Sequence, residues 1–248
     1  MKKRIFFVFL FFSVYGYAQV SVKDSSIYTP LVSLSYGYQM PGGDMANRFG
    51  NNSSIQLNVD FKTIPYIMLG LNGGYFFGNQ INEKMFTSIA TPEGNIIDRE
   101  GQFANIKTYE RGFTVSGTLG SMFHFKKPNP NSGIVVNMGF GFIQHKIRIE
   151  VIGNNVPALD KDYKKGYDKL TNGFLLTENI GYLYLSNNRM ANFYFGLECL
   201  QGFTQNRRSF DYDSISQDTK KRLDILYGAR LAWILPLYKK PPSEFYTH

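Results

Sequence analysis

The sequence predicts an all-β fold, an eight-stranded antiparallel transmembrane up-and-down β-barrel, and three observations support this prediction. Eight segments alternate between apolar side chains and small or polar ones with a period of two residues, which is the period of a β-strand. The second face of these segments is mostly Gly, Ser, Thr and Asn, which suits the narrow interior of a closed barrel better than a face against water. The connections alternate between long and short, which is typical of barrels that span a membrane.

The composition excludes several other classes of protein. The chain has 248 residues, 43% of them hydrophobic and 16% aromatic, so it is too apolar for a disordered protein. Its single cysteine, Cys199, rules out an intramolecular disulfide and a four-thiolate zinc site. The mean hydropathy is only -0.23, and no internal segment has the roughly 20 apolar residues of a spanning helix. Strands that alternate apolar with small or polar residues explain how a chain with so many aromatic residues has such a low mean hydropathy.

The first eighteen residues read as a secretory signal peptide. A basic start, Lys2 to Arg4, precedes an apolar stretch from Ile5 to Val14, and Ala18 offers a small residue for cleavage before Gln19. Residue 19 is not Cys, so lipid attachment is not expected. A retained membrane anchor is the alternative, but no stop-transfer pattern follows. Removing the three basic residues leaves 24 Lys and Arg against 19 Asp and Glu, a mature net charge of +5.

The first four predicted strands alternate clearly. The segments read LVSLSYGYQM over 31–40, IQLNVDF over 55–61, IMLGLNGGY over 67–75 and FTVSGTLGSMFH over 113–124. In each of them Leu, Ile, Val, Phe and Tyr occupy one face, and the other face is small or polar. The large apolar face is expected to contact lipid, because the small residues belong inside a narrow barrel.

The last four predicted strands follow the same rule with one exception. They read IVVNMGFGF over 134–142, GFLLTENIGYLYL over 173–185, NFYFGLEC over 192–199 and LDILYGARLAWIL over 223–235. Strict alternation in the sixth segment places Glu178 on the lipid-facing side, where acidic residues are penalised. A β-bulge near 177–179 that turns Glu178 inward is the expected solution.

The connections fix the expected orientation. The long ones are 41–52, about 78–111, about 145–171 and about 204–222, and the short ones are 63–65, 126–132 and 186–189. Membrane barrels with an even strand number have short periplasmic turns and long outer loops, so both chain ends are expected in the periplasm. The predicted barrel spans 31–238, with a periplasmic segment 19–30 before it and a periplasmic tail 239–248 after it.

The signal sequence, the eight strands and the aromatic strand ends resemble the small outer-membrane barrels of Gram-negative bacteria. The last strand is similar to the assembly signal of that class in the spacing of Gly228, Leu231 and Trp233, although Leu226 stands where a polar residue is usual. The wealth of Asn, Lys, Tyr and Phe is similar to the barrels of Bacteroidota. The resemblance implies location in the cell outer membrane and says little about activity.

Four charged residues are predicted to form a polar plug in the barrel interior. Glu198 and Arg230 face inward by parity, and a hairpin centred near 213 would place them almost opposite each other. A cross-strand ion pair is expected, because an unpaired buried charge costs several kcal/mol. Asp60 and Lys62 share an inward face near the periplasmic end and are assigned to the same plug. A proton or ion path through these residues is the alternative.

The outer loops carry the candidate binding residues. Lys164 and Lys165 in the third loop and Arg207 and Arg208 in the fourth stand among Tyr and Phe, and are candidates for contact with the phosphates of anionic outer-membrane glycolipid, a solvated loop being the alternative. Nucleic-acid binding is not expected for a secreted chain. The loop 79–111 is a candidate surface for protein partners. The tripeptide at Asp213 to Ile215 is similar to a Bacteroidota O-glycosylation acceptor, which implies modification of Ser214.

These features predict a non-enzymatic outer-membrane protein, a structural or accessory subunit of an envelope machine such as secretion or barrel assembly. The alternative is a lipid A-modifying enzyme with an active site at the barrel rim, for which His145 is the only plausible base among His124, His145 and His248. A pore is the third hypothesis, but eight strands are too few for an open channel. Neither a cofactor nor a metal is expected.

Overall fold

The computed structural model describes residues 29–63, 66–124, 128–153, 155–160, 162–186 and 191–237. The expected signal peptide 1–18 and tail 239–248 lie outside the described residues, as does nearly all of the segment 19–30.

Eight antiparallel strands form one sheet that closes on itself, because β1 pairs with β8 as well as with β2. The strands are β1 (Thr29–Gly43), β2 (Asn52–Lys62), β3 (Ile67–Gly78), β4 (Asn105–His124), β5 (Gly133–Ile152), β6 (Thr171–Tyr184), β7 (Phe193–Asn206) and β8 (Lys221–Pro236). The predicted all-β barrel is therefore confirmed. Two short 3₁₀ helices, η1 (Pro157–Leu159) and η2 (Tyr163–Gly166), lie between β5 and β6.

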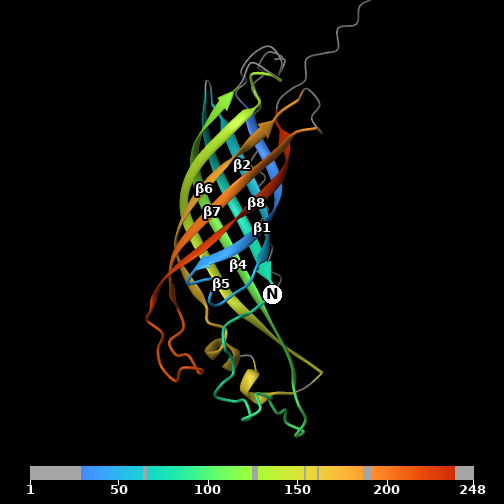
Figure 1. Ribbon diagram of the computed structural model, residues 1–248, viewed down its shortest axis with the longest axis vertical. Helices are drawn as coiled ribbons and strands as arrows, with labels where there is room; N and C mark the ends of the chain where they lie inside the picture. Colours follow the sequence, from blue (N-terminus) through green and yellow to red (C-terminus); the bar gives the residue numbers. More distant parts are fainter. Residues whose placement is uncertain are drawn as a thin grey trace, which may run out of the picture.

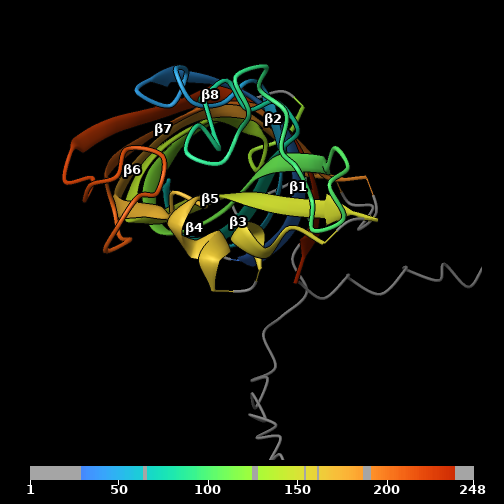
Figure 2. The same ribbon diagram turned by 90° about the horizontal axis from the view of Figure 1, so that it is seen from below.

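All long connections lie at one end of the barrel, the lower end in Figure 1, and the short turns lie at the other end. We call them loop 1 (44–51), loop 2 (79–104), loop 3 (153–170) and loop 4 (207–220). Figure 2 looks at the barrel from the long-loop end and shows loops 2, 3 and 4 around its mouth. The first described residue, Thr29, and the last, Leu237, both lie at the short-turn end, where the amide of Leu237 donates to the carbonyl of Pro30 (2.9 Å).

Two predicted loops are shorter than expected, because β4 and β5 extend past the other strands. Each has 20 residues, and the two remain paired out to Asn105 and Ile152. Residues 105–111 and 145–152, which the sequence assigned to loops, are therefore strand. Alternating Ile and charged residues in this part of β5, KIRIEVI over 146–152, continue the period of two residues beyond the end of the predicted strand.

The predicted bulge at Glu178 is wrong. The β6 ladders with β5 and β7 are continuous, with Glu178 directly between Met138 and Cys199. Its side chain is exposed on the outer wall, as strict alternation requires. A bulge would have shifted every following residue of β6 to the opposite face, and this would have placed Tyr182 and Tyr184 in the interior.

The outer wall of the barrel is a belt of exposed apolar side chains. Leu71 on β3, Leu119 on β4, Phe140 on β5 and Leu231 on β8 are each at least 57% exposed. Their strand neighbours face inward and are buried or half-buried, so apolar and small or polar residues occupy the outer and inner faces largely as the pattern predicted.

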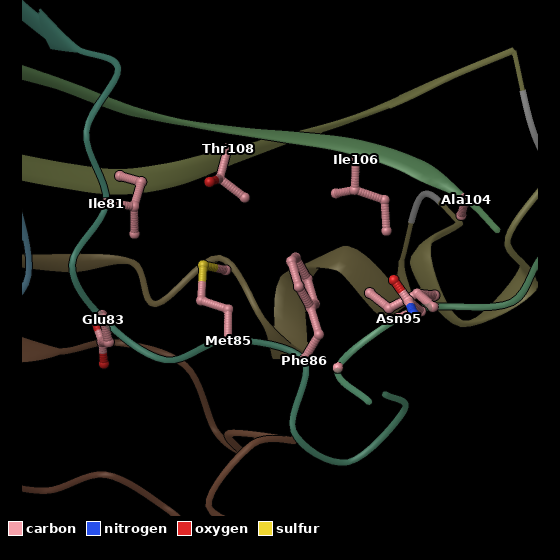
Figure 3. A pocket seen from close by; sticks show the side chains of 10 residues that line it. Ile81, Glu83, Met85, Phe86, Asn95, Ala104, Ile106 and Thr108 are labelled. Atoms are coloured by element: carbon pink, nitrogen blue, oxygen red, sulfur yellow. The ribbon is translucent and has the colours of Figure 1, made fainter. Parts of the chain in front are cut away.

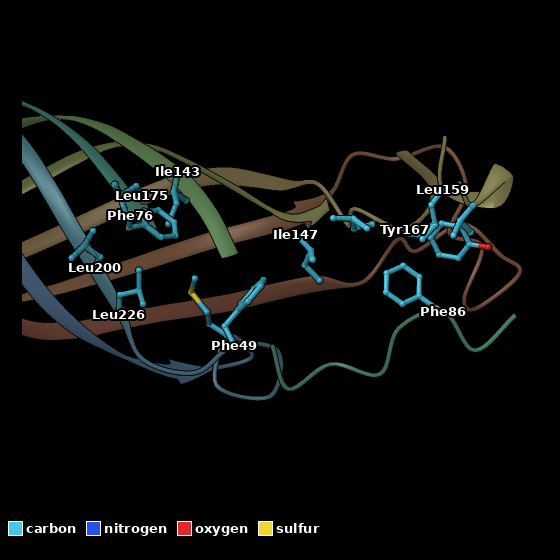
Figure 4. Close-up of a cluster of buried hydrophobic side chains, with 13 residues drawn as sticks. Phe49, Phe76, Phe86, Ile143, Ile147, Leu159, Tyr167, Leu175, Leu200 and Leu226 are labelled. Atoms are coloured by element: carbon cyan, nitrogen blue, oxygen red, sulfur yellow. The ribbon is translucent and has the colours of Figure 1, made fainter. Parts of the chain in front are cut away.

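The interior has three layers, which can be followed along β8. Ala232 and Ile234 belong to a buried apolar cluster near the short turns, Arg230 lies in a polar middle layer, and Leu226 belongs to a second apolar cluster that continues into the loops. Figure 4 shows this second cluster, which runs from Leu226 in the barrel and Phe49 in loop 1 to Phe86, Tyr167 and Leu159 in loops 2 and 3. The sequence pattern missed both apolar layers, because inward residues such as Leu226 adjoin outward ones that are also apolar.

Candidate functional site

The polar middle layer surrounds Glu198 of β7. Its carboxylate accepts hydrogen bonds from the side-chain amides of Gln39 (2.6 Å to Oε1) and Gln56 (3.0 Å to Oε2). The guanidinium of Arg230 donates to the amide oxygen of Gln56 (2.8 Å) and lies 3.7 Å from the Glu198 carboxylate. Arg230 also lies over the ring of Tyr194, 5.1 Å from its centre. Gln56 therefore connects the two charges, and four strands contribute to the network.

Glu198 and Arg230 both face the lumen, but they are not opposite each other. The register pairs Glu198 with Gly228 and Gly196 with Arg230, so the two charged residues are diagonal neighbours. This offset leaves room for the amide of Gln56 between them. The sequence reasoning missed the two glutamines, because an inward Gln looks like any other polar residue until the closed barrel brings β1 and β2 to β7.

Asp60 and Lys62 face inward as well, at different depths. Lys62 is fully buried at the short-turn end and donates to the side-chain oxygen of Asn131 in the turn before β5. Asp60 is half-buried and lines a small cavity together with Arg230. The facing position on β3 is Gly70, where an added Cβ would lie 2.1 Å from the Asp60 carboxylate. The structure thus does not place Asp60 and Lys62 in one contact.

His145, the candidate base for a rim enzyme, is not at the rim. It lies within β5, faces the interior and is 1% exposed. Its Nε2 is 2.9 Å from the carboxylate of Asp224, which also accepts from the hydroxyl of Thr204 (2.5 Å), and Phe49 meets its ring edge-on. A base enclosed in this way cannot reach a lipid substrate from the mouth of the barrel, so no contact of His145 favours the enzyme hypothesis.

The long loops form a second charge network that sequence reasoning did not find. Lys169 of loop 3 lies 3.3 Å from Glu83 of loop 2, and 3.1 Å and 3.6 Å from Asp211 and Asp213 of loop 4. Arg48 of loop 1 pairs with the same Glu83 (3.0 Å). One lysine and one arginine therefore connect all four loops. We call loops 1 to 4, joined by this charge network and by the apolar residues beneath it, the loop cap.

The pKa values of the loop cap reflect this pairing. Burial alone would lower the pKa of Lys169, but the nearby carboxylates of Glu83, Asp211 and Asp213 outweigh burial and raise it. Burial raises the pKa of Asp213, against the opposing effects of Lys169 and of the Thr87 amide, which donates to its carboxylate (3.0 Å). The cation is thus held in its charged form where the loops meet.

The predicted glycolipid-contact residues differ in how strongly their side chains are already paired with other residues of this chain. Arg208 is bound twice to Asp168, with a 2.7 Å bond from its Nε, and Arg207 donates to Asn172 (2.5 Å). Lys165 makes an exposed pair with Asp162 (2.8 Å). Lys164 is half-buried in η2. Arg208 is therefore a structural residue of the loop cap in this structure, which the sequence did not indicate.

Loop 4 displays Ser214, the candidate modification site, at an exposed turn. The turn is closed by pairing between Asp211 and Ser216, and Ile215 adopts a positive φ of 53°. The Ser214 hydroxyl is 3.1 Å from that of Ser216.

A hollow of about 320 Å³ opens in the loop cap between loop 2 and β4. Figure 3 shows apolar side chains around it, among them Ile81, Met85, Phe86 and Ile106, with Glu83 and Asn95 at its edges.

The fold and its outer wall define a class: a closed eight-stranded antiparallel barrel with an apolar exterior and a filled lumen. No helix in the described ranges is long and apolar enough to cross a membrane. Over the same ranges, no group of His, Cys, Asp and Glu is arranged to hold a metal ion.

No protein-family model matches the sequence, and the curated proteins contain no match to it. Among solved structures, the chain is similar to Ail, the attachment invasion locus protein of Yersinia pestis, with 7% identity and a TM-score of 0.44 over 84% of this chain and 99% of that one. A second structure of Ail, in complex with the heparin analogue sucrose octasulfate, gives 10% identity and a TM-score of 0.39 over 83% and 99%. Neisserial surface protein A gives 10% identity and a TM-score of 0.38 over 82% and 96%. Likenesses this distant carry no argument about function.

Proposed function

We propose that this chain is a non-enzymatic barrel of the bacterial outer membrane, which presents its loop cap to a protein partner as an accessory subunit of an envelope machine. The observation that carries the proposal is the belt of exposed apolar side chains around a closed barrel, with Phe140 at 69% and Leu71 at 65% exposure. Water-soluble proteins rarely expose a continuous apolar surface beyond a few hundred Å². Lipid tails are the solvent that such a wall suits, and a closed barrel leaves no unpaired strand edge in them.

The arrangement of the connections supports one orientation. Both described chain ends lie with the short turns, and the long loops lie at the opposite end. Outer-membrane barrels have short periplasmic turns and long outer loops. We therefore place the termini in the periplasm and the loop cap outside the cell.

Two features support a protein partner for the loop cap. First, the charge network around Lys169 and the apolar cluster beneath it hold the loops in one arrangement, and this lowers the entropy cost of binding. Second, large apolar residues remain exposed on the cap, including Phe103 at 70% and Ile215 at 73%. Lys164, Lys165 and Arg207 remain our candidates for anionic glycolipid, and Ser214 for glycosylation.

Single-cysteine labelling tests the location and the orientation together. With Cys199 replaced by Ser, cysteines are introduced at Ser214 in loop 4 and, as the matched control, at the exposed Pro128 in the turn before β5. Intact Gram-negative cells are treated with a membrane-impermeant maleimide. We expect labelling of Ser214→Cys in intact cells and of Pro128→Cys only after the outer membrane is permeabilised. Recovery of the protein in the soluble fraction, or the reverse labelling pattern, would overturn the proposal.

Affinity purification from detergent-solubilised membranes tests the partner. A stoichiometric protein is expected to co-purify with the wild-type chain and to be lost from Phe103→Asp, which places a charge on the exposed cap surface without touching the barrel. Wild-type protein that purifies alone would show a free-standing barrel and remove the accessory-subunit role.

A further inference from the structure

One charged residue interrupts the apolar outer wall of β6. The outward side chains of this strand run Phe174, Leu176, Glu178, Ile180, Tyr182 and Tyr184 from the long-loop end to the short-turn end. Glu178 therefore lies at a middle depth, with apolar residues on both sides along the strand. Its cross-strand neighbours, Met138 and Cys199, carry no charge either.

The protein itself satisfies Glu178 poorly. Among the residues that the structure describes, one hydrogen bond reaches its carboxylate, and it is a long one, 3.5 Å from the side-chain amide of Gln201 on β7. An ionisable side chain within a membrane is costly and most often marks a contact or a pathway. No lumenal path is open to Glu178, because it faces outward. A contact across the outer wall is the remaining role.

The wall beside Glu178 is also hollowed. A hollow of about 430 Å³ lies between β5, β6 and β7, and Val136, Met138, Ile180, Leu197 and Cys199 contribute to its lining. We call these residues, with Glu178 and Gln201, the Glu178 face. It combines an acceptor, a donor and a recess for an apolar side chain.

We propose that a second copy of this chain packs against the Glu178 face within the membrane. The inference rests on the membrane location proposed above. All copies are inserted in one orientation, so a two-fold axis along the membrane normal brings the same residues together at the same depth. The Gln201 amide of each copy then donates to the Glu178 carboxylate of the other, which makes the polar pair self-complementary. Apolar side chains of each copy fill the hollow of the other.

The single cysteine provides a natural probe, because Cys199 is the cross-strand neighbour of Glu178. The full-length chain is produced in Gram-negative outer membranes, and a membrane-permeant bismaleimide is added. We expect a cross-linked dimer at twice the monomer mass. Two controls accompany it: Cys199→Ser alone, which must abolish the product, and Cys199→Ser with Leu71→Cys, which moves the probe to the exposed wall of β3 and should give no dimer.

Variants at Glu178 separate a specific contact from random collision. Glu178→Leu should lower the cross-linked fraction about tenfold, because both reciprocal hydrogen bonds are lost. Glu178→Gln keeps an acceptor and a donor and should retain the dimer. The Leu variant makes the lipid-facing wall more apolar, so its barrel is expected to form, and the heat-dependent shift of its gel mobility verifies this.

Three results would overturn the proposal that a second copy packs against the Glu178 face. They are no dimer from a correctly inserted wild-type chain, equal cross-linking from Leu71→Cys, or a cross-link to a different protein only. A chain that is absent from the membrane fraction would instead refute the proposed location, and with it this inference.

Discussion

The polar layer of the lumen and the loop cap both enclose buried charges, but they are assembled in opposite ways. In the lumen, Arg230 and Glu198 come from neighbouring strands and are joined through Gln56, so the barrel ladder positions them. In the cap, Lys169 gathers carboxylates from loops 2 and 4, which have no common ladder. Strand parity can therefore predict that the two charged residues of the lumenal network face inward, whereas only the folded loops reveal the network of the cap.

The largest effect is expected from breaking the lumenal network. Arg230→Met removes the cation and leaves the Glu198 carboxylate buried with amide partners alone. We expect the free energy of unfolding to fall by about 3 to 5 kcal/mol, as for other buried pairs that lose one partner. Urea titration of the barrel in phospholipid vesicles, followed by gel mobility, measures this.

The double variant Arg230→Met with Glu198→Gln sharpens the same point. Removing both charges leaves no uncompensated ion, so the double variant should be more stable than Arg230→Met alone. Equal losses in the single and double variants would show that the two charges do not act as a pair.

A smaller and local effect is expected from the loop cap. The pKa of Lys169 is raised above its usual value of 10.5. A group whose pKa is raised by folding stabilises the folded form below its unfolded pKa, and this contribution is lost as the pH rises through its folded pKa. Loops 2 to 4 should therefore resist protease up to about pH 10.5 and become cleavable above it, while the barrel remains folded. Lys169→Met should be cleavable already at neutral pH, and resistance in that variant would contradict the role given to Lys169.

The pair between Arg208 and Asp168 should contribute less, because it is partly exposed. Arg208→Lys retains the charge but cannot form both parallel hydrogen bonds, so the cap should lose about 1 kcal/mol or less. Hydrogen exchange at the amides of loops 3 and 4 would detect this loss. Faster exchange confined to the strands would not fit the assignment.

The smallest effect is expected at Asp213. Burial already disfavours its charged form, and Asp213→Asn retains an oxygen that accepts from the Thr87 amide. We expect a change within about 0.5 kcal/mol, and loop proteolysis like that of the wild type. Asp213→Leu, which removes the acceptor as well, serves as the comparison and should loosen the turn that carries Ser214.

The sequence predicted the strand number, the alternation of faces and the inward positions of Glu198 and Arg230, because these depend on local period two and on parity. It did not predict Gln39 and Gln56 as partners of Glu198, since their approach requires closure of the barrel. The apolar ends of the lumen were missed because Leu175 and Leu226 adjoin outward apolar residues. The energetic cost of an acidic residue facing lipid led to the prediction that Glu178 turns inward, but the continuous ladder keeps its side chain on the outer wall.

Solute flux across liposomes tests the central claim most directly, which is that the barrel spans the membrane and is closed by its own interior. The refolded chain is incorporated into liposomes loaded with a small fluorescent solute, and heat-dependent gel mobility confirms insertion. We predict solute retention equal to that of empty liposomes for the wild-type chain, because two apolar layers and the polar layer fill the lumen. Rapid solute loss through an inserted wild-type barrel would contradict the claim.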